Sequence, residues 1–187
     1  MSMIGHTLIN EVVVELNIVD PGEILNQLDS KLRHVLKQDN SDDSTRDGMD
    51  ICLCVLDKNL ESLMNAGANR PLWHVKKSNE TNTFELLEVK ATKTAIGGMH
   101  ESEVEFITRQ VNLEIGDSIY LSTDGYADQF SSDDKKLMTK RFKELIVSIQ
   151  ENSMQQQREI LNDFLANWKG ETEQTDDVLV IGIRKGT

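Results

Sequence analysis

The chain has 187 residues, and its 20 basic and 32 acidic residues give a formal net charge of -12 at pH 7. This length favours one domain, residues 1–187, with a core of its own. The negative charge argues against nucleic acids and anionic membrane surfaces as partners. No apolar run reaches the roughly 18 residues of a membrane-spanning helix, and no signal peptide is recognisable. We therefore expect a soluble, cytoplasmic protein.

The first third of the chain predicts two helices. Apolar residues recur at helical spacing from Met1 to Glu15, so the chain is expected to open inside a buried helix, without an N-cap before it. A capping acid and a proline at the first helical position, in Asp20-Pro-Gly-Glu23, predict a second helix that runs to about Lys37. The polar residues Gln38 to Arg46 predict a surface loop.

The middle of the chain predicts strands joined by short turns, which is typical of antiparallel sheets. Ile51 to Leu56 is apolar on both faces and predicts a central buried strand, with Leu60 to Asn65 as its hairpin partner. Ala66 to Pro71 is expected to form a loop of small residues. Further strands are predicted at Leu72 to Lys76, Thr83 to Val89, Val104 to Leu113 and Ser118 to Ser122.

The chain has two cysteines, Cys52 and Cys54, and both lie in an apolar strand. We expect their side chains to point to opposite faces of the sheet and not to bond to each other. Free thiols in a chain without a signal peptide indicate a reducing compartment. A soft-metal site is not expected, because no second pair of Cys or His residues stands nearby.

Helices are predicted again near the end of the chain. Asp133 to Gln150 carries an apolar helical stripe, and Ser153 begins a capping box for a helix that Gly170 ends. The apolar run Val178 to Ile183 predicts a closing strand. The order of helices, strands, helices and strand indicates an α+β fold. Its economical arrangement is a four-layer sandwich of helix, sheet, sheet and helix.

Acidic residues stand at the ends of two predicted strands. Ser118 to Ser122 leads into Asp124-Gly125, with Asp128 four residues after Asp124, and Asp176-Asp177 precedes the closing strand. If the two strands lie side by side, their carboxylates converge and suit Mg²⁺ or Mn²⁺. Glycine beside Asp124 lets a ligand or a second backbone segment come close. Solvated acids in a common Asp-Gly turn are the alternative.

Five motifs occur in the order and spacing of a known family. They are Asp47-Gly-Met-Asp50, Ala66-Gly-Ala-Asn69, Ala95-Ile-Gly-Gly98, Thr123-Asp-Gly-Tyr-Ala-Asp128 and Thr175-Asp-Asp-Val178. Over nearly its whole length, the chain resembles the PPM phosphatases, the metal-dependent type 2C serine/threonine phosphatases, in the bacterial branch of RsbU and SpoIIE.

The resemblance implies a four-layer αββα sandwich with two Mn²⁺ or Mg²⁺ ions, and a metal-activated water that attacks phosphoserine or phosphothreonine. It assigns Asp124 and Asp176 as metal ligands and places the Gly125 backbone near the ions. Asp128 and Asp177 become outer carboxylates or remain solvated loop acids. The implied substrate is a phosphorylated regulatory protein, such as an anti-sigma-factor antagonist, in signal transduction.

The chain departs from the family pattern at its beginning. The family has an Asp-x-x-Gly-His-Gly-like motif before the first helix, whose Asp bridges both ions, and Gly5-His6 lies within the helix that follows that motif. We therefore expect the bridging Asp and the first strands to be missing here. The chain is then a fragment of a phosphatase, a pseudophosphatase that binds a phosphoprotein, or one copy of a homodimer that completes the sheets. An unrelated acidic scaffold, not stabilised by divalent metal, is a further alternative.

Overall fold

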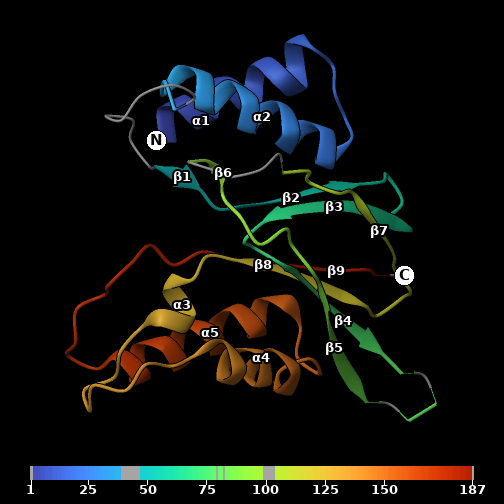
Figure 1. The fold of residues 1–187 in the computed structure, drawn as a ribbon. Helices are drawn as coiled ribbons and strands as arrows, with labels where there is room; N and C mark the ends of the chain where they lie inside the picture. Colours follow the sequence, from blue (N-terminus) through green and yellow to red (C-terminus); the bar gives the residue numbers. More distant parts are fainter. Residues whose placement is uncertain (1, 39–46, 79, 82, 99–103, 187) are drawn as a thin grey trace. The chain divides into compact units, whose positions relative to one another are not determined.

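The computed structural model describes residues 2–38, 47–78, 80–81, 83–98 and 104–186. The chain forms two compact units, each assembled from two separate segments. Unit 1 comprises Met1–Leu72 and Val89–Leu113, and unit 2 comprises Trp73–Glu88 and Glu114–Thr187. Each unit combines helices with antiparallel sheet, so each contains the two kinds of layer that the expected sandwich needs (Figure 1).

Unit 1 places its helices on one face of a three-stranded sheet (Figure 1). Its sheet has the order β2-β3-β7, and a separate pair joins β1 to β6. The helical elements are α1 (Ser2–Asn10), the π-helical turn η1 (Glu11–Glu15) and α2 (Pro21–Val35). The strands are β1 (Gly48–Met49), β2 (Ile51–Leu56), β3 (Ser62–Ala68), β6 (Ile96–Gly97) and β7 (Arg109–Asn112).

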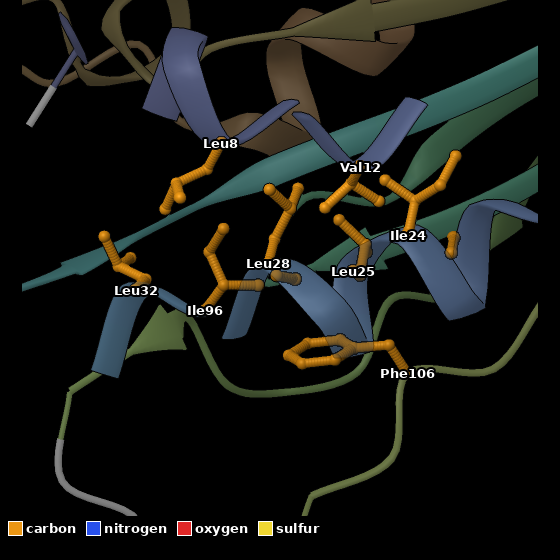
Figure 2. Close-up of a cluster of buried hydrophobic side chains, with 10 residues drawn as sticks. Leu8, Val12, Ile24, Leu25, Leu28, Leu32, Ile96 and Phe106 are labelled. Atoms are coloured by element: carbon orange, nitrogen blue, oxygen red, sulfur yellow. The ribbon is translucent and has the colours of Figure 1, made fainter. Parts of the chain in front are cut away.

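The core of unit 1 lies between the helices and the sheet. Leu25, Leu28 and Leu32 of α2 are nearly fully buried, and Leu8 of α1 and Val12 of η1 pack beside them (Figure 2). Ile51 and Leu53 of β2 pack against this cluster. The predicted apolar stripes therefore face one another, and their burial stabilises the unit by roughly 1.5–3 kcal/mol for each large side chain.

The start of α2 is fixed by capping and by a close approach of the backbone. The side chain of Asp20 accepts a hydrogen bond from the amide of Glu23 at 2.9 Å, and a second from the hydroxyl of Thr108 at 2.6 Å. A Cβ atom on Gly22 would lie 2.6 Å from the carbonyl oxygen of Phe106. Glycine at this position therefore lets the helix begin directly against residues 106–108.

The motif Ala95-Ile-Gly-Gly98 docks on α2. The carboxylate of Asp29 accepts the amide of Gly97 at 2.7 Å, and Gln38 accepts the amide of Gly98 at 2.8 Å. Gly97 has a φ of +71°, and a Cβ there would lie 2.7 Å from Leu32. Both the backbone conformation and the close helix therefore require glycine.

Unit 2 is built around a four-stranded sheet with the order β5-β4-β8-β9, and its helices lie on one side of β8 and β9 (Figure 1). The strands are β4 (Leu72–Lys77), β5 (Phe84–Val89), β8 (Ser118–Ser122) and β9 (Val180–Arg184). The helices are α3 (Gly125–Asp128), α4 (Thr139–Ser148) and α5 (Met154–Lys169). The core gathers Trp73, Tyr120, Tyr126, Phe142, Ile146 and Leu161 with their neighbours.

Several sequence predictions are confirmed and others are wrong. The Asp20 cap and the Ser153 capping box are present, and Gly170 ends α5 with a φ of +54°. Strand β2 is not central, because among the described residues it pairs with β3 at one edge of the sheet. Ala66–Ala68 belong to β3 and not to a loop. The helix predicted from Asp133 begins only at Thr139, and the strand predicted from Val104 only at Arg109.

The expectation that the two cysteine side chains point to opposite faces of the sheet is also wrong. Residues i and i+2 of a strand share a face, so Cys52 and Cys54 both lie on the face of β2 opposite Ile51 and Leu53. Both thiols accept a hydrogen bond from the side chain of Asn65. The loop predicted at residues 38–46 falls outside the described residues except for Gln38, which is buried.

Candidate functional site

The two strands that carry the predicted acidic ends lie side by side in unit 2. Strands β8 and β9 pair antiparallel, with Ser122 opposite Val180. The residues that follow β8 therefore meet the residues that precede β9. This register brings the segment of Asp124 and Gly125 next to the segment of Asp176 and Asp177, as the convergence argument requires.

Thr123 joins these two segments through both its main chain and its side chain. The amide of Thr123 donates to the carbonyl of Leu179 at 3.1 Å. Its hydroxyl donates to the carbonyl of Asp177 at 2.8 Å and accepts the amide of Leu179 at 2.9 Å. The hydroxyl thus continues the strand pairing beyond the last regular residue of each strand.

Gly125 is where the two backbones come closest. A Cβ atom on this residue would lie 2.5 Å from the carbonyl oxygen of Asp177 and 3.2 Å from that of Asp176. Real Cβ atoms do not approach a backbone oxygen this closely, so a side chain here would push the two segments apart. Glycine therefore sets the spacing between the two acidic ends.

The acidic side chains differ in their surroundings. Asp124 is partly buried, and its carbonyl accepts the amide of Asp128 at 2.9 Å at the start of α3. Asp128 forms an ion pair with Lys136 at 3.0 Å. Asp176 and Asp177 are exposed, and one carboxylate oxygen of Asp176 accepts the amide of Asp177 at 2.7 Å.

The structure therefore brings the main chain at Asp124 and Gly125 next to the main chain at Asp176 and Asp177, while the carboxylate of Asp128 pairs with Lys136. Across the described ranges, no group of three or more His, Cys, Asp or Glu side chains gathers as a metal cluster would. Two carboxylates with water ligands suit one hard cation such as Mg²⁺. This donor set does not by itself complete a centre for two ions.

Sequence reasoning missed Gln129 as a residue that supports this site. Gln129 is fully buried, and its side-chain amide donates to the carbonyl of Glu173 at 3.0 Å, in the loop before Asp176. The main-chain carbonyl of Gln129 accepts the indole N–H of Trp168 at 3.0 Å. A buried glutamine next to an Asp-Gly motif gives no local signal, because its partners lie about forty residues away in the sequence.

A cavity of about 480 Å³ lies between α5 and β9 in unit 2. Its walls are largely apolar, and Arg158 is the charged residue among those that line it: Tyr126, Met154, Gln157, Arg158, Leu161, Asn162, Leu165, Val178, Leu179, Val180, Ile181 and Gly182. None of these lining residues is a carboxylate, so the cavity does not have the ligands of a hard cation. The acidic strand ends, and not this cavity, are the candidate site.

In the part of the chain that the structure describes, no helix has both the length and the apolar character needed to cross a membrane.

Comparisons with known proteins agree with the motifs. The model of the family described as Stage II sporulation protein E (SpoIIE) matches residues 1–185. The SiaA-PP2C domain of Pseudomonas aeruginosa is similar, with 26% sequence identity and a TM-score of 0.81, over 97% of this chain and 68% of that chain. A search of curated proteins gives no match.

Two further solved structures share the fold at lower identity. The phosphatase domain of SpoIIE from Bacillus subtilis, solved with a fragment of its regulatory domain, is 14% identical with a TM-score of 0.67, over 96% of this chain and 48% of that chain. The catalytic domain of the serine threonine protein phosphatase PstP, in complex with two manganese ions, is 14% identical with a TM-score of 0.58. The match covers 96% of this chain and 80% of that chain. The expected α+β fold class of the PPM phosphatases is confirmed.

Proposed function

This chain belongs to the SpoIIE family of phosphatase-like domains, and we propose that it is a metal-dependent protein serine/threonine phosphatase. Its substrate would be a phosphoserine or phosphothreonine residue of a regulatory protein. The observation that carries the proposal is the pairing of β8 with β9, which brings the ends with Asp124 and Asp176 together. Acidic residues in an irregular loop would have no such common position.

The charge of the site supports a role for a cation. A phosphorylated side chain carries a charge of about -1.5 to -2 at neutral pH, and the chain itself carries -12. Carboxylates alone would repel such a substrate. We propose that Asp124 and Asp176 hold Mn²⁺ or Mg²⁺, with Asp177 close by, and that the exposed position of Asp176 leaves room for a phosphoprotein.

A bound cation of this kind lowers the pKa of a coordinated water and offsets phosphate charge. Other residues of the chain hold the segments of the proposed metal ligands in place. Thr123 holds the Asp177 main chain, Gly125 keeps the two segments in close contact, and Gln129 fixes the loop before Asp176. Asp128 forms an ion pair with Lys136 at 3.0 Å, and we assign it no metal ligand role. The catalytic domain of PstP holds two manganese ions, whereas Asp124 and Asp176 of this chain would supply ligands for one.

The second candidate is a pseudophosphatase that binds a phosphoprotein without hydrolysing it. The observation that favours it is the donor set, since no group of three potential ligands gathers among the described residues. In either role the partner would be a phosphorylated regulatory protein in the cytoplasm, for example an anti-sigma-factor antagonist. Pairing with a second copy is a further proposal, which the molecular mass in solution tests.

The test is hydrolysis of p-nitrophenyl phosphate in millimolar Mn²⁺ by the chain, Asp124→Asn and Asp176→Asn. Asp163→Asn, at an exposed position on α5, is the matched control. Mn²⁺-dependent turnover that both site variants lose and the control keeps supports the phosphatase. Absence of turnover with Mn²⁺-dependent binding of a phosphoserine peptide supports the pseudophosphatase. If the chain shows no turnover and no metal-dependent binding of the peptide, both proposals are overturned.

A further inference from the structure

A pair of thiols lies on one face of β2 in unit 1, whereas the acidic strand ends belong to unit 2. Strand β2 pairs with β3 so that Cys54 lies opposite Asn65. The side-chain nitrogen of Asn65 lies 3.3 Å from the sulfur of Cys52 and 3.4 Å from the sulfur of Cys54. One amide group therefore donates to both sulfurs, which fixes them around a common point.

Asn65 is itself held firmly. It is 1% exposed, and the same nitrogen donates to the carbonyl of Leu53 at 3.0 Å. An amide nitrogen has two hydrogens. The hydrogen bond to Leu53 uses one and orients the group, and the two sulfurs share the other. Both cysteine residues are partly exposed. A buried donor shared by two partly exposed cysteines is a built feature of this sheet.

The pair also divides its protonation states unequally. The pKa of Cys52 lies below its ordinary value because the Cys54 thiol donates a hydrogen bond to it, with a smaller contribution from Asn65. The pKa of Cys54 is raised by the same hydrogen bond and by burial. Cys52 is therefore the first to become a thiolate, and thiolates are the form that binds soft metals and reacts as a nucleophile.

We propose that Cys52 and Cys54 form a two-sulfur site for a single thiophilic atom, either trivalent arsenic or a soft metal ion. A bridging atom bonded to sulfur at about 2.3 Å needs two neighbouring sulfurs, and two thiols on one face of β2 that both lie within 3.4 Å of the same nitrogen meet this need. Sulfur ligands select soft acceptors, so the site is chemically distinct from the oxygen ligands of Asp124 and Asp176. Asn65 would remain a hydrogen-bond donor to the bound sulfurs, as groups around metal thiolates are.

The binding steps conserve atoms and electrons. An aryl arsenoxide reacts with two thiols to form two arsenic–sulfur bonds, and its oxygen leaves with both thiol protons as water. Arsenic stays trivalent and neither sulfur is oxidised. A soft divalent cation instead displaces one proton from each thiol to solvent. Neither step needs an oxidant or a further reactant.

Phenylarsine oxide and Cd²⁺ are the two probes, and the chain is well suited to them because it has no cysteines other than this pair. Intact mass spectrometry under native conditions should show one arsenical per chain, with loss of both titratable thiols. Cys52→Ser and Cys54→Ser should each weaken binding by about 100-fold, since the second sulfur then no longer acts at high effective concentration. Circular dichroism checks that both variants remain folded.

The Cd²⁺ titration separates a metal site from a site for arsenic alone. One Cd²⁺ per chain, with an ultraviolet thiolate charge-transfer band that both serine variants lose, establishes a soft-metal site. Arsenical binding without this band restricts the site to trivalent arsenic, within the proposal. Two arsenicals per chain, or serine variants that bind as tightly as the original chain, would overturn it, because each sulfur would then act alone.

Discussion

Thr123 and Asp177 are joined by a hydrogen bond of 2.8 Å from the threonine hydroxyl to the aspartate carbonyl. The same hydroxyl accepts the amide of Leu179. A single side chain therefore fixes the position of the segment that carries Asp176 relative to the segment that carries Asp124. The geometry of the candidate metal site depends on a residue that has no carboxylate.

Thr123→Val tests this positioning role. Valine keeps the shape of threonine but removes both side-chain hydrogen bonds, so the Asp176 segment is expected to lose its fixed position. Mn²⁺ affinity, measured by isothermal titration calorimetry, should fall by about tenfold, at the low end for residues that orient metal ligands. Thr123→Ser retains the hydroxyl and should bind as the original chain does. Equal affinity in the valine variant would mean that the hydroxyl has no part in positioning.

Gly125→Ala tests the close approach of the two backbones. Gly125 begins α3, so alanine there is strained by its close contacts, which are the carbonyl oxygens of Asp177 at 2.5 Å and Asp176 at 3.2 Å from the added carbon. We expect a loss of about 1–3 kcal/mol in the free energy of unfolding, measured in urea. Gly186→Ala is the matched control, because a Cβ there meets nothing within 4 Å, and it should change stability by less than about 0.5 kcal/mol. Similar values for both variants would contradict the argument.

Local hydrogen-bond chemistry accounts for what the sequence predicts well. The Asp20 cap bonds to Glu23, and Ser153 bonds to Gln156, so each signal and its partner lie three residues apart. Both caps depend on few residues and on short-range geometry. The pairing of β8 with β9 is different, because from sequence it is only the condition under which the acidic strand ends converge, and the structure shows that this condition is met.

Long-range partners account for what the sequence does not show. Residues 129–138 stay out of α4 while Gln129 bonds to Glu173 and Lys136 pairs with Asp128. The residue pattern of this segment predicts neither of these two contacts. The error about Cys52 and Cys54 has a different origin. The period of two in a strand already places both side chains on one face, so the sequence was sufficient to predict this. Only the donor that they share, Asn65, required the structure.

Asp20→Asn should change the dependence of stability on pH. The pKa of Asp20 lies below its ordinary value of 3.8, chiefly because the Thr108 hydroxyl donates to it and also because of the Glu23 amide. A lowered pKa means that the unfolded chain binds the proton more readily. This contribution is therefore complete above pH 3.8 and is lost as pH falls below it.

The measurement is the free energy of urea unfolding from about pH 6 to about pH 3. Asparagine still caps the helix, so the variant should be only slightly less stable at the upper pH. The difference between the two proteins should shrink as the aspartate becomes protonated. A difference that stays constant over this range would show that Asp20 has the same pKa in the folded and unfolded chain.

Tyr126→Phe tests the role of the buried tyrosine hydroxyl of α3 in stability at neutral and alkaline pH. Tyr126 is 2% exposed, stacks on Phe142 with ring centroids 4.1 Å apart, and donates its hydroxyl to the carbonyl of Leu161 at 2.8 Å. Phenylalanine keeps the stacking and loses the hydrogen bond, so unfolding at neutral pH should cost about 1 kcal/mol less.

Burial raises the pKa of Tyr126 above its ordinary value of 10.0, so the phenol stays neutral in the folded chain while it ionises in the unfolded chain. The original chain should therefore lose stability above pH 10 faster than the variant, and the two curves should converge by about pH 11. Parallel curves from about pH 8 to about pH 11 would contradict this account, because every other titrating group is common to both proteins.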